Sequence, residues 1–175
     1  GGVDLVRVDG AKLPVNPDAR FVATRLFRSN EGKRFEDVTN SAGILSHDYG
    51  QGCAVADYDN DGDRDLYVTN YGRCALYQNN SDGTFTEVTS VAHVPGGQWN
   101  TGACFVDLDR DGLLDLYVAN YFDFPTINYQ ACRGEEGELE YCGPGDSPSL
   151  PDSLYRNLGD GQFADISQAF GTPTP

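Results

Sequence analysis

The sequence predicts an all-β fold of consecutive four-stranded antiparallel sheets, arranged like the blades of a β-propeller. Three observations lead to this prediction. A hairpin-like segment occurs three times along the 175 residues, an acidic loop between two apolar runs occurs twice, and no helix-length window has an apolar period of about 3.6 residues. Four short strands in about 40–50 residues is the period of a propeller blade.

The recurring hairpin segment consists of one strand, a polar turn with glycine, and a second strand. It reads LFRSNEGKRFEDVT over residues 26–39, LYQNNSDGTFTEVT over 76–89 and LYRNLGDGQFADIS over 154–167. Each second strand contains Phe, with Val or Ile three residues later, and both are residue types that favour strands. Each segment therefore predicts a β-hairpin.

The acidic pattern places a loop rich in Asp between two apolar strands. It reads GCAVADYDNDGDRDLYVTNY over residues 52–71 and ACFVDLDRDGLLDLYVANY over 103–121. The apolar runs are nearly continuous, which indicates strands covered on both faces, as in stacked blades. Residues 3–6 align with residues 64–67, so the sequence is expected to begin just inside a third acidic loop.

The spacing of these patterns divides the chain into repeats. From Leu26 to Leu76 is 50 residues, as it is between the first Asp residues of the two acidic loops, whereas Leu154 follows Leu76 by 78. The extra residues, about 28 of them, predict a surface loop inserted over 122–152. The whole chain is expected to be one repeat region, 1–175, with blade-like repeats at about 1–48, 49–98 and 99–175.

The charge excludes some classes of partner. The chain has 27 acidic and 12 basic residues and a formal net charge of −15, so its surface repels nucleic acid and anionic membranes. No apolar stretch approaches the roughly 20 residues of a membrane span, and no signal segment is visible.

Five cysteines are present without a CxxC pair, so a zinc or thioredoxin-like site is not indicated. Cys132 and Cys142 lie in the inserted loop and can close it as a disulfide, which suits an oxidising compartment. The odd count leaves one of Cys53, Cys74 and Cys104 free or paired between chains. We therefore expect a secreted, extracellular or cell-surface protein, with the periplasm as a further location.

The acidic loops predict two calcium sites. Calcium takes about six to eight oxygen ligands, and carboxylates at loop positions 1, 3 and 5 converge on one point. Glycine at position 6 permits the sharp turn, a carbonyl at position 7 adds an oxygen, and Asp at position 9 closes the site. The predicted ligands are Asp57, Asp59, Asp61, Asp63 and Asp65 in loop one, and Asp107, Asp109, Asp111, Leu113 and Asp115 in loop two.

Other interpretations of these loops fit less well. An EF-hand needs Glu at position 12 and flanking helices, but position 12 is Val68 or Val118 within a predicted strand. Ordinary solvated turns would leave several carboxylates repelling one another. Magnesium prefers few carboxylates and several waters.

The pattern G-x-[GC]-x-x-x-[DG]-x-D-x-D-G-x-x-D-L-Y-V resembles the FG-GAP or VCBS repeat, which builds the calcium-bearing blades of integrin α-subunit propellers. LYVTNYG, WNTGACFVDLDRDG and LYVANYFDF then follow in order, before Cys132, the run YCGP at 141–144 and LPDSLYRNLGDGQF. Over about residues 22–171 this succession resembles the secreted cartilage-acidic-protein (ASPIC/UnbV-associated) family.

The resemblance implies integrin-α-like calcium loops and a role in adhesion or scaffolding. Three blades cannot close a ring, so we expect them to be partial or to be completed by other chains. Open blade edges favour strand pairing, and hence self-association into an oligomer or filament, or binding of a protein partner.

We therefore expect a non-enzymatic, calcium-binding extracellular module that mediates adhesion or protein–protein assembly. One alternative is a carbohydrate-binding or polysaccharide-cleaving propeller, although the arginines are scattered rather than clustered. Another is a subunit of a larger surface complex or filament. Asn79 begins an N-glycosylation sequon on a hairpin turn, and the same residues also suit a plain turn.

Overall fold

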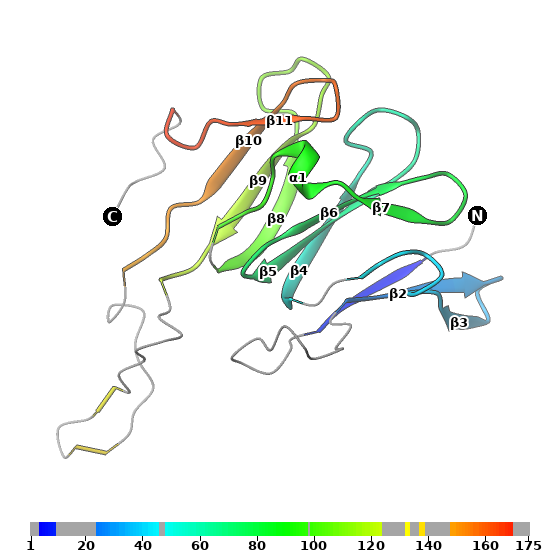
Figure 1. The fold of residues 1–175 in the computed structure, drawn as a ribbon, viewed down its shortest axis with the longest axis horizontal. Coiled ribbons are helices and arrows are strands. Elements are labelled where there is room, and N and C mark those ends of the chain that lie inside the picture. The colour runs from blue at the N-terminus through cyan, green and yellow to red at the C-terminus, as the bar shows by residue number, and fades with distance from the viewer. Residues whose placement is uncertain are drawn as a thin grey trace.

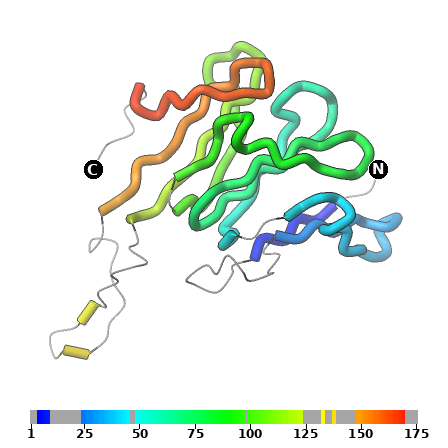
Figure 2. The backbone as a smooth tube through the Cα atoms, in the orientation of Figure 1, coloured from blue at the N-terminus to red at the C-terminus, as the bar shows by residue number. Residues whose placement is uncertain are grey.

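The chain folds into three antiparallel β-sheets that follow one another in sequence order (Figure 1). The structure is a computed structural model, and it describes residues 4–9, 24–45, 48–97, 99–123, 132–133, 137–138 and 148–169. Within each sheet the backbone runs up and down between neighbouring strands (Figure 2). The predicted all-β class with antiparallel sheets is confirmed.

The first sheet has the order β1-β2-β3, the second β4-β5-β6-β7 and the third β8-β9-β10-β11. Their bounds are β1 Leu5–Val8, β2 Thr24–Asn30, β3 Arg34–Asp37, β4 Tyr49–Ala56, β5 Asp65–Tyr71, β6 Ala75–Asn79, β7 Phe85–Glu87, β8 Asn100–Val106, β9 Asp115–Asn120, β10 Ser153–Asn157 and β11 Phe163–Asp165.

Two features differ from the simple repeat that the sequence predicts. The first sheet has three strands among the described residues, where four are predicted for a blade. A short helix, α1 (Thr89–Ala92), follows the second sheet. In the ranges that the structure describes, no helix has the length and apolar character needed to cross a membrane.

The strand register supports the alignment of residues 3–6 with 64–67. Leu5 of β1 lies opposite Phe27, as Leu66 of β5 lies opposite Tyr77 in the next sheet. Since Phe27 and Tyr77 occupy the same place in the two hairpins, β1 corresponds to β5. The Oδ1 atom of Asp4 also accepts a hydrogen bond from the N–H of Ser29 at 3.3 Å.

A side-chain hydroxyl closes each of the three hairpins at the same position. The N–H of Leu26 donates to Thr39 Oγ1 at 3.0 Å and that of Leu76 to Thr89 Oγ1 at 2.8 Å. In the third sheet the N–H of Leu154 donates to Ser167 Oγ at 2.9 Å. The Thr or Ser that ends each hairpin segment thus satisfies a backbone donor that the adjacent strand leaves unpaired.

The hydrophobic core lies between the sheets, in two clusters that meet at β5. Every residue of β5 from Asp65 to Asn70 is buried. Its Leu66 and Val68 belong to a cluster with Leu26 and Ile44 from the first repeat. Successive side chains of a strand point to opposite faces, so β5 contacts both neighbouring repeats. Its apolar run is continuous because both faces of the strand are covered, as the sequence predicts.

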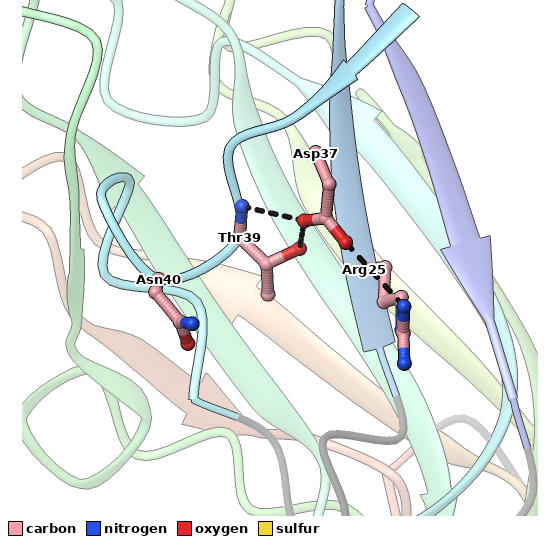
Figure 3. Close-up of a pocket in the computed structure, with 4 residues that line it drawn as sticks. All are labelled: Arg25, Asp37, Thr39 and Asn40. Carbon is pink, nitrogen blue, oxygen red and sulfur yellow. Dashed lines mark hydrogen bonds and ion pairs between the residues drawn. The ribbon is translucent and has the colours of Figure 1, made fainter.

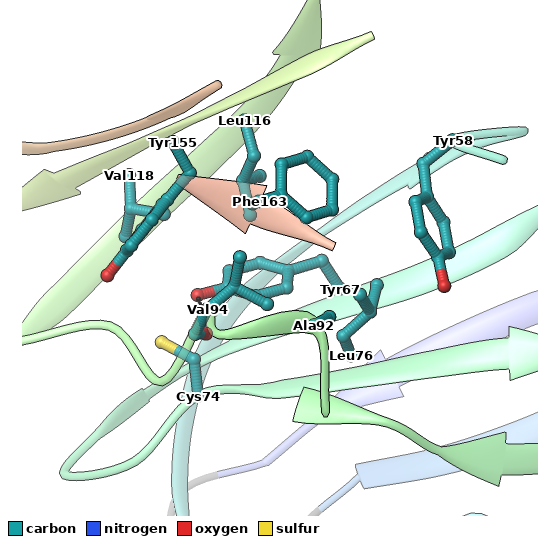
Figure 4. Close-up of a cluster of buried hydrophobic side chains, with 10 residues drawn as sticks. All are labelled: Tyr58, Tyr67, Cys74, Leu76, Ala92, Val94, Leu116, Val118, Tyr155 and Phe163. Atoms are coloured by element: carbon teal, nitrogen blue, oxygen red, sulfur yellow. Dashed lines mark hydrogen bonds between the residues drawn. The ribbon is translucent and has the colours of Figure 1, made fainter. Parts of the chain in front are cut away.

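The second cluster joins the second and third sheets (Figure 4). Its aromatic rings contact one another across the interface, since the ring centroids of Tyr58 and Phe163 lie 5.6 Å apart. Its members are Tyr58, Tyr67, Cys74, Leu76, Ala92, Val94, Leu116, Val118, Tyr155 and Phe163.

Strand β4 lies beside β8, so the first strands of the second and third sheets are neighbours. Gly52 explains how closely they approach, because a Cβ atom at this position would lie 3.2 Å from the carbonyl oxygen of Thr101. The glycine that precedes the apolar run therefore permits the stacking of the two sheets.

The inserted segment leaves β9 and returns to β10 at one place. Phe122 forms a bridge with Ser149, and the N–H of Leu150 donates to the carbonyl of Tyr121 at 3.0 Å. Asp152 Oδ1 then accepts from the N–H of Asn120 at 2.8 Å, which fastens the returning chain to β9. The insertion thus starts and ends within the pairing of two adjacent strands.

We predict that Thr89→Val lowers the free energy of unfolding by about 1–3 kcal/mol, because the buried N–H of Leu76 loses its acceptor while the volume is kept. Urea denaturation of the full chain measures this. The matched control is Thr86→Val on the same hairpin, where the side chain is exposed, and its effect should stay within about 0.5 kcal/mol. Equal effects of the two substitutions would contradict this role of the Thr89 hydroxyl.

Candidate metal centre

The two acidic loops have the same backbone conformation. Loop one (residues 57–64) joins β4 to β5, and loop two (residues 107–114) joins β8 to β9. At position 4, φ is 59° for Asn60 and 65° for Arg110, and at position 6 it is 97° for Gly62 and 89° for Gly112. Positive φ at position 6 favours glycine, so the repeated sequence produces the same turn twice.

Each loop brings three carboxylates together. Asp57, Asp59 and Asp61 each offer an oxygen atom, and these atoms all lie within 4.8 Å of one another. Asp107, Asp109 and Asp111 form the equivalent group in loop two. The structure therefore gathers the residues predicted at positions 1, 3 and 5.

Backbone N–H groups hold the first carboxylate of each loop in place. Asp57 accepts from the N–H of Asp61 at 3.1 Å and from that of Gly62 at 3.0 Å. Asp107 accepts from the corresponding groups of Asp111 and Gly112 at 3.2 and 3.1 Å. The loop is thus wrapped around this side chain.

The position 9 residues serve a different part of the structure. Asp65 is fully buried, and its Oδ2 accepts from the N–H of Tyr58 at 3.1 Å while its Oδ1 accepts from that of Asn79 at 2.9 Å. Asp115, 2% exposed, accepts in the same way from Leu108 and Asn157. These carboxylates join the loop to the following hairpin and lie outside the three-residue groups.

Two asparagines complete this connection, and the sequence analysis did not assign them to the site. Asn79 Nδ2 donates to the carbonyl of Arg64 at 3.0 Å. Asn157 Nδ2 donates to the carbonyls of Leu114 and Tyr58, at 3.0 and 2.8 Å. The signal available in the sequence was Asn at the same offset in the hairpin segments 76–89 and 154–167.

The two loops are in direct contact. Asn157 of the third sheet reaches Tyr58 in loop one, and Asn60 Nδ2 of loop one donates to the carbonyl of Gly112 in loop two at 3.4 Å. These two hydrogen bonds connect loop one to loop two and to the third sheet.

The donor groups fit a hard cation. All three side chains in each group offer carboxylate oxygens, the ligand type that calcium prefers. Held this close, the carboxylates repel one another unless a cation neutralises them. Within the described ranges, no Lys or Arg forms an ion pair with a loop-one carboxylate.

Three other predicted site residues, Asp63, Leu113 and Asn79, lie outside the three-carboxylate groups. The side chain of Asp63 accepts a hydrogen bond from Ser81 Oγ, and the predicted carbonyl ligands of Asp63 and Leu113 stay predictions. The Asn79 side-chain nitrogen, which would carry a glycan, already donates to Arg64, and glycosylation also stays a prediction.

Cys53, Cys74 and Cys104 are free thiols. Burial raises the pKa of Cys74, and also that of Cys53. The predicted Cys132–Cys142 disulfide cannot be placed, because Cys142 lies outside the described residues, and it stays a prediction.

A separate shallow cavity of about 170 Å³ lies at the first hairpin (Figure 3). Asp37 Oδ2 lies 3.4 Å from Arg25 Nη1, and Asp37 Oδ1 accepts from the N–H and hydroxyl of Thr39 at 3.1 and 2.5 Å. These bonds, those from Thr39 above all, lower the pKa of Asp37. Three of the four lining residues bond to one another, and Thr39 is the residue that closes the hairpin, so we assign this cavity a structural role.

We predict that Asn157→Ala destabilises the protein by about 1–3 kcal/mol, because the buried carbonyl of Tyr58 and the partly buried carbonyl of Leu114 lose their donor. Chemical denaturation measures the loss. Gln168→Ala, at an exposed position after the same hairpin, is the control and should be nearly neutral. A neutral Asn157→Ala variant would show that this connection is dispensable.

We also predict that Asp65 titrates near pH 6 in chelator. Burial is the main cause of this rise of its pKa to about 6, and the charges of Asp59 and Asp61 add to it. Because the folded-state pKa lies above the ordinary value of 3.8, the stability that this carboxyl contributes is greatest below about pH 4 and is lost as pH rises through about 6. Carboxyl ¹³C NMR gives the midpoint, and a midpoint near pH 4 would contradict the effect of burial.

A family model described as an FG-GAP-like repeat matches residues 57–118. The match begins at the first Asp of loop one and extends through loop two into β9. A search of curated proteins gives no significant match. The finer resemblance to the cartilage-acidic-protein family stays a prediction. Residues 57–118, which hold both acidic loops, are thus similar to the FG-GAP-like repeat.

Proposed function

We propose that this protein is a non-enzymatic, calcium-stabilised module that mediates protein–protein contacts outside the cell or at its surface. The observation that carries the proposal is the pair of three-carboxylate groups, one in each loop of the segment that matches the FG-GAP-like repeat. FG-GAP repeats are commonly extracellular protein-interaction modules and often bind calcium.

The ion would be held by the carboxylates of Asp57, Asp59 and Asp61 in loop one, and by those of Asp107, Asp109 and Asp111 in loop two. Bound calcium supplies positive charge and fixes the turn; it takes no part in a reaction. Asp65 connects loop one, and Asp115 connects loop two, to the hairpin that follows in the same sheet, so an ion bound in a loop also stabilises that hairpin.

The interaction role is supported by the exposed parts of the sheets. Every residue of β3 is exposed, and Phe35 on this strand is 57% exposed. Val106 at the end of β8 and Leu108 in loop two are also exposed. Edge strands and exposed apolar side chains of this kind favour pairing with a second copy or with another protein.

Calcium should raise the melting temperature, since a ligand that binds only the folded state adds about 2.7 kcal/mol per site at 100 times its dissociation constant. We expect chelator to lower the melting temperature by a large amount, and magnesium to restore little of the lost stability. Differential scanning calorimetry and calcium titration calorimetry measure the two effects.

The double variant Asp61→Asn/Asp111→Asn tests the site directly, because Asn keeps the oxygen that accepts the local backbone bond but removes the charge. It should lose most of the stabilisation by calcium. The control variant Glu31→Gln/Glu36→Gln removes the same amount of charge from exposed residues of the first repeat. It should keep the full stabilisation by calcium. Equal melting temperatures with calcium and with chelator for the unmodified chain would refute the calcium role.

Assembly should depend on calcium. We expect light scattering to give a mass above the 19.0 kDa of one chain in millimolar calcium, and a lower mass after chelation. A mass of 19.0 kDa in both conditions would exclude calcium-dependent self-association and would direct the search to a partner protein.

A further inference from the structure

The two loops differ in the residue that reaches them from the adjacent hairpin. Gln78 on β6 lies opposite Thr86, and Arg156 on β10 lies opposite Ala164. These registers place Gln78 and Arg156 at the same position of their hairpins. The chain therefore presents a neutral amide to loop one and a cation to loop two.

Both side chains contact the carboxylate at loop position 3. Gln78 Nε2 donates to Asp59 Oδ2 at 2.6 Å. Arg156 Nη2 lies 2.6 Å from Asp109 Oδ2 and 3.7 Å from Asp111 Oδ2. Arg156 thus forms ion pairs with two of the three carboxylates that loop two brings together.

The loops also differ at position 7, where loop one has Asp63 and loop two has Leu113. Loop one has five Asp residues, which are Asp57, Asp59, Asp61, Asp63 and Asp65, whereas loop two has four, which are Asp107, Asp109, Asp111 and Asp115. Each loop also contains one arginine, Arg64 in loop one and Arg110 in loop two, so these two residues do not change the difference in net charge between the loops. The surroundings of loop two are therefore more positive by two elementary charges.

We propose that Arg156 makes loop two the weaker calcium site and holds that loop together when calcium is scarce. This inference rests on the proposed calcium function. A calcium ion at loop two must either displace the guanidinium from Asp109 and Asp111 or bind beside a like charge. At loop one the corresponding residue is Gln78, whose neutral amide donates to Asp59 and adds no positive charge.

The size of the effect is limited by solvent. The side chain of Arg156 is 50% exposed and that of Asp109 is 40% exposed, so water and salt screen the pair. Ion pairs of this kind change an equilibrium by up to about fivefold. The two loops should then fill in order, loop one first, as free calcium rises.

The experiment follows the N–H signals of Gly62 and Gly112 by NMR in the full chain at buffered concentrations of free calcium. Each glycine N–H donates to the first carboxylate of its own loop, so its signal responds directly to an ion bound in that loop. In the unmodified chain Gly112 should reach half-saturation at a higher calcium concentration than Gly62. Arg156→Gln should lower the Gly112 midpoint by about fivefold, and Gln78→Arg should raise the Gly62 midpoint by a similar factor.

Arg73→Gln is the matched control. Arg73 forms an exposed ion pair with Glu87 at 3.0 Å, and its replacement by Gln removes the same charge as Arg156→Gln does. It should leave both midpoints unchanged. In one outcome, both loops saturate with calcium while Arg156→Gln leaves the Gly112 midpoint unchanged, or moves it no more than Arg73→Gln does. That result overturns this inference but leaves the calcium function in place. If neither glycine signal responds to calcium, the proposed function fails and this inference fails with it.

Discussion

The structure depends most on a buried carboxylate that joins each acidic loop to the hairpin after it. Asp65 is without solvent contact and accepts one N–H from the loop and one from the hairpin. Asp115 repeats this arrangement in the third sheet. A buried carboxylate that accepts two backbone donors leaves both unsatisfied if it is removed. The same side chain therefore sets the shape of the loop and the position of the hairpin.

This connection couples the loops to the packing between sheets. Asn157, held at its backbone by Asp115, donates to the carbonyl of Tyr58 in loop one, and the Tyr58 ring packs against Phe163. The polar contacts between the loops thus lie directly beside the apolar cluster that joins the second and third sheets. An ion bound in either loop would therefore also stabilise that interface.

The electrostatics of the two loops differ. Loop one has five carboxylates without an ion pair among the described residues, so a bound cation would relieve more repulsion there than in loop two. Loop two receives the guanidinium of Arg156 from a hairpin strand more than 40 residues further along the chain. Repeats that share one backbone conformation can therefore differ in affinity through a single residue outside the loop.

The sequence by itself determined the all-β class, the hairpins and the positions of the two acidic loops. These features depend on local chemistry, since the turn residues, the side-chain alternation and the spacing of Asp around one glycine act within a few residues. Only the tertiary structure decided that Asp65 and Asp115 are buried, that Thr39, Thr89 and Ser167 close the hairpins, and that Arg156 reaches loop two. The reason is that each depends on a partner brought near by stacking of sheets or pairing of strands, as with Asn157 and Tyr58, which are 99 residues apart.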